Sequence, residues 1–149
     1  MNKKLTIGFT GTQLGMTIEQ SDAVKRIVKE LRNNIEEVGH GDCIGADAEF
    51  HKIAMEFKIP VILHPPIKDD KRAFCKGYIE SFPKKDYLVR NRDIVDNSDV
   101  LLATPKSSSE EVRSGTWATI RYALKKKKLV IIIFPNGKTK TKLGDFHAT

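Results

Sequence analysis

The sequence predicts a single α/β domain with a mainly parallel sheet of about five strands and helices on both faces. Short apolar runs alternate with longer amphipathic segments, which is the order of strands and helices in such a fold. The runs at 5–9 and 129–134 are apolar and do not alternate with polar residues along their length, as expected for parallel strands buried on both faces. The chain has 149 residues, a length that suits one domain. We assign 1–149 to this domain, with a core at about 5–135 and a peripheral tail at 136–149.

The first half of the chain contains three predicted strands and two predicted helices. The run at 5–9 is the first strand. Thr17 and Gln20 then form a capping box, and apolar residues continue at helical spacing as far as Ile35. We therefore expect a helix over 18–37, a second strand at 38–41, a helix over 46–57 and a third strand at 59–63.

The second half begins with a long polar segment, 67–85, that contains Gly77 and Pro83 and is predicted to be a loop. Long loops inside compact domains are often functional. A helix is expected at 87–96, a fourth strand at 99–104, a serine-rich loop at 105–111, a helix at 113–127 and a fifth strand at 129–134.

The composition favours a protein of the cytoplasm with an anionic partner. Lys and Arg number 26 against 19 Asp and Glu, for a net charge of +7. Cys43 and Cys75 are the two cysteines, too few for a disulfide scaffold, and we expect both to be reduced. No run of about 20 apolar residues is present, so we expect no membrane contact. The N-terminal apolar run is too short for a signal peptide, which also favours the cytoplasm.

The candidate binding residues follow the predicted strands, because ligands of parallel sheets lie at the carboxyl ends of the strands. Gly11 and Thr12 follow the first strand. Asp42, Gly45 and Asp47 follow the second, where glycine permits close approach to a ligand. The two aspartates could cap the next helix and accept backbone amides, or could bind a ribose hydroxyl.

The loop after the fourth strand ends in Ser114, Gly115 and Thr116, which begin a helix and offer amides and hydroxyls to an anion. Arg113 precedes them, and Arg90 lies on the preceding predicted helix. An arginine can bind phosphate through two hydrogen bonds, so we expect Arg90 and Arg113 to hold a phosphate. The alternative is that these arginines pair with carboxylates on their own helix or loop.

A metal site is the weaker interpretation of the histidines and cysteines. The set His40, Cys43, His51 and His64 fits no zinc spacing. We therefore expect neither a bound metal nor a resident cofactor.

Two segments resemble the SLOG superfamily of Rossmann-like proteins, which joins SMF/DprA-type and Lonely Guy-type proteins. The first is His40-Gly41-Asp42-Cys43-Ile44-Gly45-Ala46-Asp47, and the second runs from 87 through Arg90 to Ser114-Gly115-Thr116. The resemblance covers about 5–135. It implies a Rossmann-like fold, a nucleotide or nucleotide-derived ligand, and a homo-oligomer.

One departure from the Lonely Guy phosphoribohydrolases bears on activity. Their catalytic glutamate stands three residues after the Gly-Thr pair, where this chain has Thr119. Cleavage of an N-glycosidic bond needs a carboxylate to stabilise the oxocarbenium-like state or to activate water. Glu110, Glu111 and Asp42 are the candidates, and no spacing distinguishes among them.

Three functions follow from these observations. The first is binding of a nucleotide-derived ligand by a sensor or sequestering protein, in which Gly11, Thr12, Asp42, Gly45, Asp47, Arg90, Arg113, Ser114, Gly115 and Thr116 line one cleft. The alternative is a nucleoside 5′-monophosphate N-glycosidase. The third is single-stranded nucleic-acid binding, which the dispersed basic residues disfavour.

Overall fold

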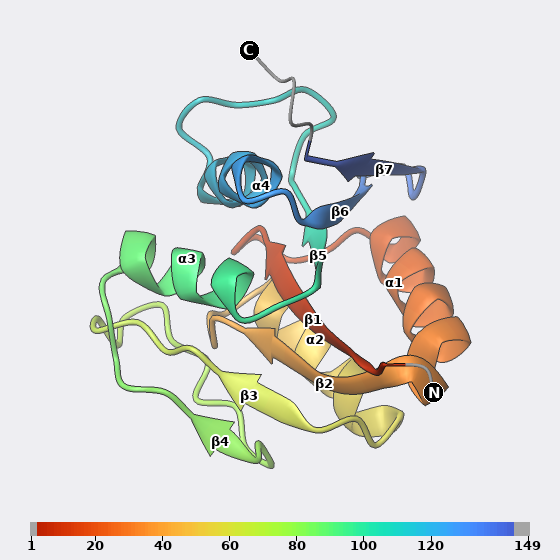
Figure 1. Ribbon diagram of the computed structural model, residues 1–149. Coiled ribbons are helices and arrows are strands. Elements are labelled where there is room, and N and C mark those ends of the chain that lie inside the picture. The colour runs from red at the N-terminus through yellow and green to blue at the C-terminus, as the bar shows by residue number, and fades with distance from the viewer. Residues whose placement is uncertain (1–2, 145–149) are drawn as a thin grey trace.

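The computed structural model describes residues 3–144 and shows a three-layer α/β domain (Figure 1). The elements in chain order are β1 (Leu5–Gly11), α1 (Ile18–Leu31), the 3-10 helix η1 (Arg32–Asn34), β2 (Ile35–His40), α2 (Ala46–Glu56), β3 (Val61–Leu63), β4 (Glu80–Ser81), α3 (Tyr87–Asp96), β5 (Val100–Thr104), α4 (Gly115–Lys125), β6 (Leu129–Ile133) and β7 (Thr139–Leu143). No helix among residues 3–144 is long and apolar enough to cross a bilayer.

The sheet has seven strands in the order β4-β3-β2-β1-β5-β6-β7, and only the β6–β7 pair is antiparallel. The predicted parallel sheet is thus confirmed, with seven strands in place of about five. The chain passes from β1 outward to β4 and then returns to place β5 beside β1. The strand order therefore reverses between β1 and β5, where Rossmann-like sheets bind their ligands.

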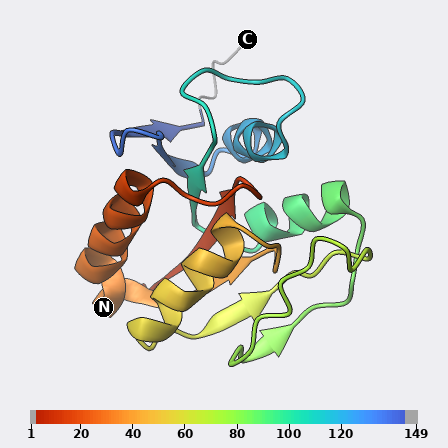
Figure 2. The same cartoon turned by 180° about the vertical axis from the view of Figure 1, so that it is seen from behind.

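Helices cover both faces of the sheet, as expected. The views from the two sides show α3 and α4 over one face and α1 and α2 over the other (Figures 1 and 2). The larger core lies beneath α1 and α2, where the rings of Phe9 and Phe50 stack at 4.2 Å. The second core lies beneath α3 and α4 and includes Ile94 and Ile120.

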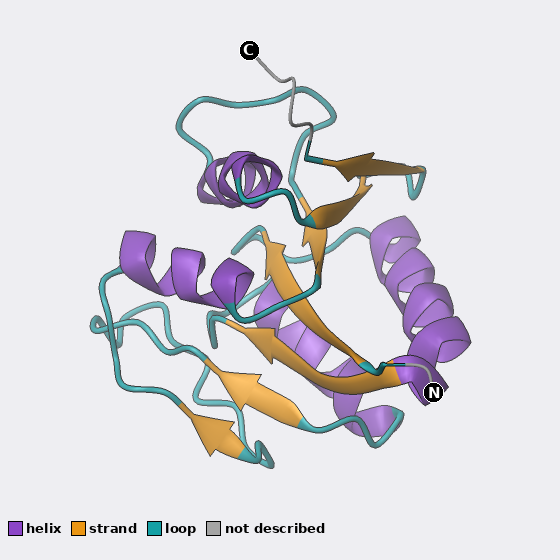
Figure 3. Cartoon of the chain, in the orientation of Figure 1, coloured by secondary structure: helices purple, strands orange, loops and turns teal. Residues whose placement is uncertain are grey.

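The predicted helix over 18–37 is wrong at its carboxyl end. The capping box of Thr17 and Gln20 is present, but α1 ends at Leu31 and β2 begins at Ile35 (Figure 3). Ile35 continues the helical spacing of apolar residues, yet it is buried as the first residue of β2 and lies opposite Leu5. A single apolar residue at the helical spacing also fits a strand that starts there.

Two strands were not predicted. β4 is a two-residue strand within the segment expected to be a loop, and it pairs with β3. β7 lies in the segment expected to be a peripheral tail, and pairs along its full length with β6. Every residue of β7 is exposed, so its sequence carries no apolar signal. The rest of that expected tail, 145–149, lies outside the described residues.

Candidate functional site

A cleft of about 710 Å³ opens where the strand order reverses. Its walls come from the carboxyl ends of β1 and β2, the loop after β3, helix α3, the loop after β5 and the start of α4. The volume falls within the range of roughly 300–1,000 Å³ that is usual for small-molecule sites. The backbone closes the floor, because the amide of Thr12 donates to the carbonyl of Thr104 at 3.2 Å.

The structure brings most of the sequence-predicted site residues to this one cleft. Those that line it are Gly11, Thr12, Asp47, Arg90, Arg113, Ser114, Gly115, Thr116 and the candidate acid Glu111. Three others do not line it: Asp42, Gly45 and Glu110. The loops after β1, β2 and β5 thus converge, and each of the three absent residues has another use.

The start of α4 presents an open, cationic surface to the cleft. Ser114 is the N-cap, and its hydroxyl accepts a hydrogen bond from the amide of Trp117 at 3.2 Å. A Cβ atom added at Gly115 would meet no atom within 4 Å, so there is space beside the helix N-terminus. The side chain of Arg113 is exposed and forms no ion pair with any residue in 3–144. The positive end of a helix and an unpaired guanidinium together favour an anion.

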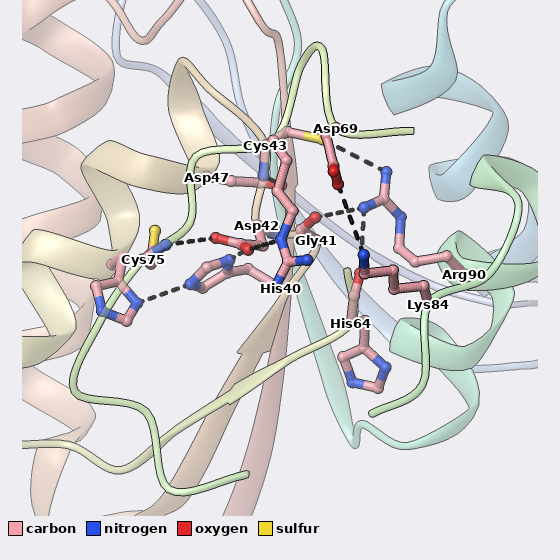
Figure 4. Close-up of polar contacts among 12 residues, drawn as sticks. His40, Gly41, Asp42, Cys43, Asp47, His64, Asp69, Cys75, Lys84 and Arg90 are labelled. Carbon is pink, nitrogen blue, oxygen red and sulfur yellow. Dashed lines mark hydrogen bonds and ion pairs between the residues drawn. The ribbon is translucent and has the colours of Figure 1, made fainter. Parts of the chain in front are cut away.

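Arg90 lines the same cleft but is only 5% exposed, and its guanidinium is already hydrogen-bonded. One amino group donates to the carbonyls of Gly41 and His64, as Figure 4 shows, and Nε donates to Asn91 at 2.7 Å. Arg90 therefore holds the ends of β2 and β3 against α3. Its charge still contributes to the potential of the cleft, since no ion pair within 3–144 neutralises it.

Asp42 has a structural use instead of a place in the cleft. Its side chain is fully buried, and it accepts from Nε of Arg72 at 2.8 Å and from the amide of Cys75 at 2.9 Å. The backbone of Asp42 also accepts from the amide of Ala73 at 2.8 Å. These contacts join the loop after β3 to the end of β2 (Figure 4). This geometry agrees with the alternative in which Asp42 accepts hydrogen bonds from backbone amides.

Asp47 lies in the first turn of α2, at the wall of the cleft. Its Oδ2 accepts from the amide of Cys43 at 3.2 Å, and its side chain is 7% exposed. Burial raises the pKa of this carboxyl to about 6, although the Arg90 charge and the backbone amides favour the ionised form. In its ionised form this carboxylate can accept hydrogen bonds from N–H or O–H groups of a ligand.

The two glutamates of the serine-rich loop differ in position. Glu110 forms an ion pair with Arg121 at 2.7 Å, on the outer side of α4. Glu111 lines the cleft, and its Oε1 accepts from the hydroxyl of Ser107 at 2.8 Å. Among the three candidate acids, only Glu111 is thus placed to contact a ligand in this cleft.

Two glycines near the cleft are required by their surroundings. A Cβ atom at Gly11 would lie 2.3 Å from Oγ1 of Thr104 and 2.5 Å from Cβ of Ala46. Gly45 has a φ of +86°, and a Cβ there would lie 2.3 Å from the carbonyl oxygen of Gln13. Gly45 therefore serves the close approach of the β1 and β2 loops, while Gly11 also lines the cleft.

Sequence reasoning missed three lysines of the cleft: Lys68, Lys71 and Lys106. All three are exposed, and the first two lie in the loop after β3. With Arg90 and Arg113 they give five cations against Asp47, Asp70 and Glu111. The only signal in the sequence was the net positive charge, because the topology alone brings these loops together.

The histidines do not form the metal set considered from the sequence. The one group of three possible ligands in the described chain is His40, His51 and Cys75. However, Nδ1 of His40 accepts from the amide of Asp42 at 2.9 Å, so its Nε2 carries the proton that is donated to Nδ1 of His51 at 2.9 Å. His51 in turn donates through Nε2 to the carbonyl of Lys76 at 2.6 Å. This chain of hydrogen bonds uses the nitrogens that a metal would need.

Comparison with solved structures shows the fold of the chain. No family model and no curated protein sequence matches the chain. The molybdenum cofactor binding protein from the phototrophic bacterium Rippkaea orientalis has a TM-score of 0.66 and 17% identity, over 90% of this chain and 78% of that one. The molybdenum cofactor carrier protein from Chlamydomonas reinhardtii has a TM-score of 0.62 and 24% identity, over 87% of this chain and 76% of that one. These similarities support the Rossmann-like α/β fold that the sequence predicts.

Proposed function

We propose that the protein binds a phosphorylated, nucleotide-derived ligand in this cleft without transforming it, as a sensor or sequestering protein. The observation that carries the proposal is the pairing of an open helix N-terminus with the unpaired guanidinium of Arg113. A dianionic phosphate would accept from the amides of Gly115 and Thr116 and from Arg113.

The rest of the cleft suits the remainder of such a ligand. The lysines extend the positive surface toward further phosphates or carboxylates. Asp47 and Asn91 supply side-chain oxygens that can accept N–H or O–H donors of a ribose or heterocycle. Tyr87 offers a ring face at the same wall. The resemblance to the SLOG superfamily, the Rossmann-like fold and the position at the strand-order reversal support the same class of ligand.

The decisive experiment is calorimetric titration with adenosine and guanosine 5′-monophosphates and with the unphosphorylated nucleosides. We expect binding of the monophosphates and at least tenfold weaker binding of the nucleosides, about 1.4 kcal/mol, because the phosphate provides the charge-assisted hydrogen bonds. The Arg113→Ala variant should lose about ten- to a hundredfold in affinity. Arg26→Ala is the matched control, since Arg26 is exposed on α1 and lies outside the cleft. Equal affinities for phosphorylated and unphosphorylated compounds would refute the phosphate anchor.

Because two structural neighbours are named for the molybdenum cofactor, the ligand panel includes that cofactor as a separate arm. Preferential binding of the cofactor would support the cleft as the binding site, but would show that its ligand is the cofactor instead of a nucleotide.

A second candidate function, nucleotide N-glycosidase, rests on Glu111. Its carboxylate lines the cleft beside the predicted phosphate site and could stabilise an oxocarbenium-like state or activate water. The test is release of free base and ribose 5-phosphate from the same monophosphates. Turnover that Glu111→Gln abolishes would favour this candidate, and binding without turnover would favour the sensor.

A further inference from the structure

A second, smaller depression of about 210 Å³ lies away from the cleft, on one face of the sheet. Alternate residues of four adjacent strands and their ends form its floor and walls: Thr6, Gly8, Glu37, Gly39, Ile62, His64, Glu80 and Phe82. Their spacing of two places them on the same face of the sheet. Figure 1 shows α3 over β1, whereas no helix stands in front of β3 and β4. Gly39 leaves part of this face without a side chain, while Ile94 and Ser98 from α3 and its end fill the space above Gly8 and complete the lining.

His64 is the unusual residue of this depression. It is 4% exposed, yet its ring forms no hydrogen bond with any residue described between 3 and 144. Its backbone carbonyl accepts from Arg90, while Figure 4 shows the ring turned away from that arginine. Nε2 lies 3.3 Å from the position that a Cβ of Gly39 would occupy, so the ring edge borders the depression. Its ring nitrogens are not among the fully enclosed, unpartnered polar atoms of the described residues, so a group in the depression can reach them.

Two carboxylates stand at the same face without a cation. Glu37 on β2 and Glu80 on β4 both line the depression, and neither takes part in an ion pair within the described chain. Partial burial and repulsion by Glu36 and Glu80 raise the pKa of Glu37. A cation between Glu37 and Glu80 would relieve that repulsion. The aromatic ring of Phe82, 4.7 Å from that of His64, adds a face on which a planar cation can lie.

We propose that this depression is a second binding site, for a single small organic cation with several N–H donors, of which a guanidinium is the best match. The carboxylates of Glu37 and Glu80 accept two of its hydrogen bonds, and the unprotonated nitrogen of the neutral His64 ring accepts a third. The volume suits a group the size of one amino-acid side chain and is too small for a nucleotide. The site is independent of the proposed function, because its lining shares only Ile94 with the main cleft.

The experiment is an NMR titration of the ¹⁵N-labelled protein with N-acetyl-arginine amide, and with the citrulline analogue, which has a similar shape and no charge. We expect saturable shifts at the amides of Gly39 and Ile62, with a dissociation constant of about 1 mM, as is typical of a single small group. The citrulline analogue should bind about tenfold more weakly.

The double variant Glu37→Gln, Glu80→Gln should abolish these shifts, while Glu30→Gln should retain them, because Glu30 is exposed on α1 and lies outside the depression. Thermal melts of all variants check that each is folded. Equal shifts with the uncharged analogue, or shifts that persist in the double variant, would overturn the proposal. So would the absence of a saturable response in the wild-type protein.

The cation could belong to a free metabolite or to an arginine of a second copy of the chain. Sedimentation velocity with and without the probe separates these two sources, since the probe would dissociate a dimer only in the second case. Either result is compatible with the site, whose chemistry is the same in both.

Discussion

Nε of Arg72 lies 2.8 Å from Oδ2 of Asp42, and this buried ion pair joins the loop after β3 to the carboxyl end of β2. The Asp42 side chain has no exposure, and that of Arg72 is 14% exposed. The same carboxylate accepts the amide of Cys75 at 2.9 Å. The loop that carries Lys68 and Lys71 into the cleft is therefore fixed to the sheet through Asp42.

Asp42→Asn should lower the free energy of unfolding by about 3 kcal/mol, because it leaves the buried guanidinium of Arg72 without its counter-ion. Chemical denaturation measures this loss. Asp69→Asn is the control, since its pair with Lys84 is 3.8 Å long and exposed, and should change stability by less than about 1 kcal/mol. Unchanged stability of Asp42→Asn with a loss of nucleotide affinity would show that Asp42 acts on the ligand instead.

Gly11→Ala should destabilise the protein by about 1–3 kcal/mol, because the added methyl group would overlap Thr104 and Ala46. Gly115→Ala is the matched control, since its methyl group would meet nothing within 4 Å. We expect no loss of stability in Gly115→Ala, but weaker nucleotide binding, because the methyl group would enter the proposed phosphate site. Paired thermal melts and titrations of both variants measure these effects. Full nucleotide affinity in Gly115→Ala would place the phosphate elsewhere.

The Asp47 carboxyl should make the folded state less stable as the pH rises from about 4 to 6. Its pKa is raised from 3.8 to about 6 on folding, so the folded state holds a proton that the unfolded state has released. This costs roughly 3 kcal/mol above pH 6. Over this pH range the wild type should therefore lose stability relative to the Asp47→Asn variant. A difference that is constant with pH would contradict the raised pKa.

His64 should have the opposite effect over nearly the same range. Burial lowers its pKa from 6.5 to about 4, so the unfolded state binds a proton that the folded state does not. The stability that its neutral form contributes is present above pH 6.5 and is lost, by roughly 3 kcal/mol, as the pH falls toward 4. His64→Gln should lose less stability than wild type on acidification. Parallel losses in both proteins would show that His64 titrates normally.

The sequence predicted the strand and helix order well because each buried element carries its own apolar pattern. β5 and β6, for example, are apolar runs whose strands pair in register from Val100 and Leu129 onward. The capping box of Thr17 and Gln20 set the start of α1 for a similarly local reason. β7 could not be predicted, since its five residues are exposed and are held by backbone pairing with β6.

The site was predictable where glycines and a helix start mark a loop, as at Gly11 and Gly115. It was not predictable where a role depends on distant residues. By its position in the sequence Asp42 is a candidate ligand, but its carboxylate bonds to Arg72, which lies 30 positions away along the chain. Lys106 is one of many lysines in the sequence, and only the fold places it at the cleft.

The most direct test of the central claim is to follow the backbone amides of Gly115 and Thr116 by NMR during titration with adenosine 5′-monophosphate. Adenosine serves as the control ligand. We predict that both amides shift in a saturable way with the monophosphate and respond weakly to the nucleoside, and that Arg113→Ala weakens the response by about ten- to a hundredfold. Saturable binding that leaves these two amides unperturbed, or that is unchanged in Arg113→Ala, would contradict a phosphate site at the start of α4.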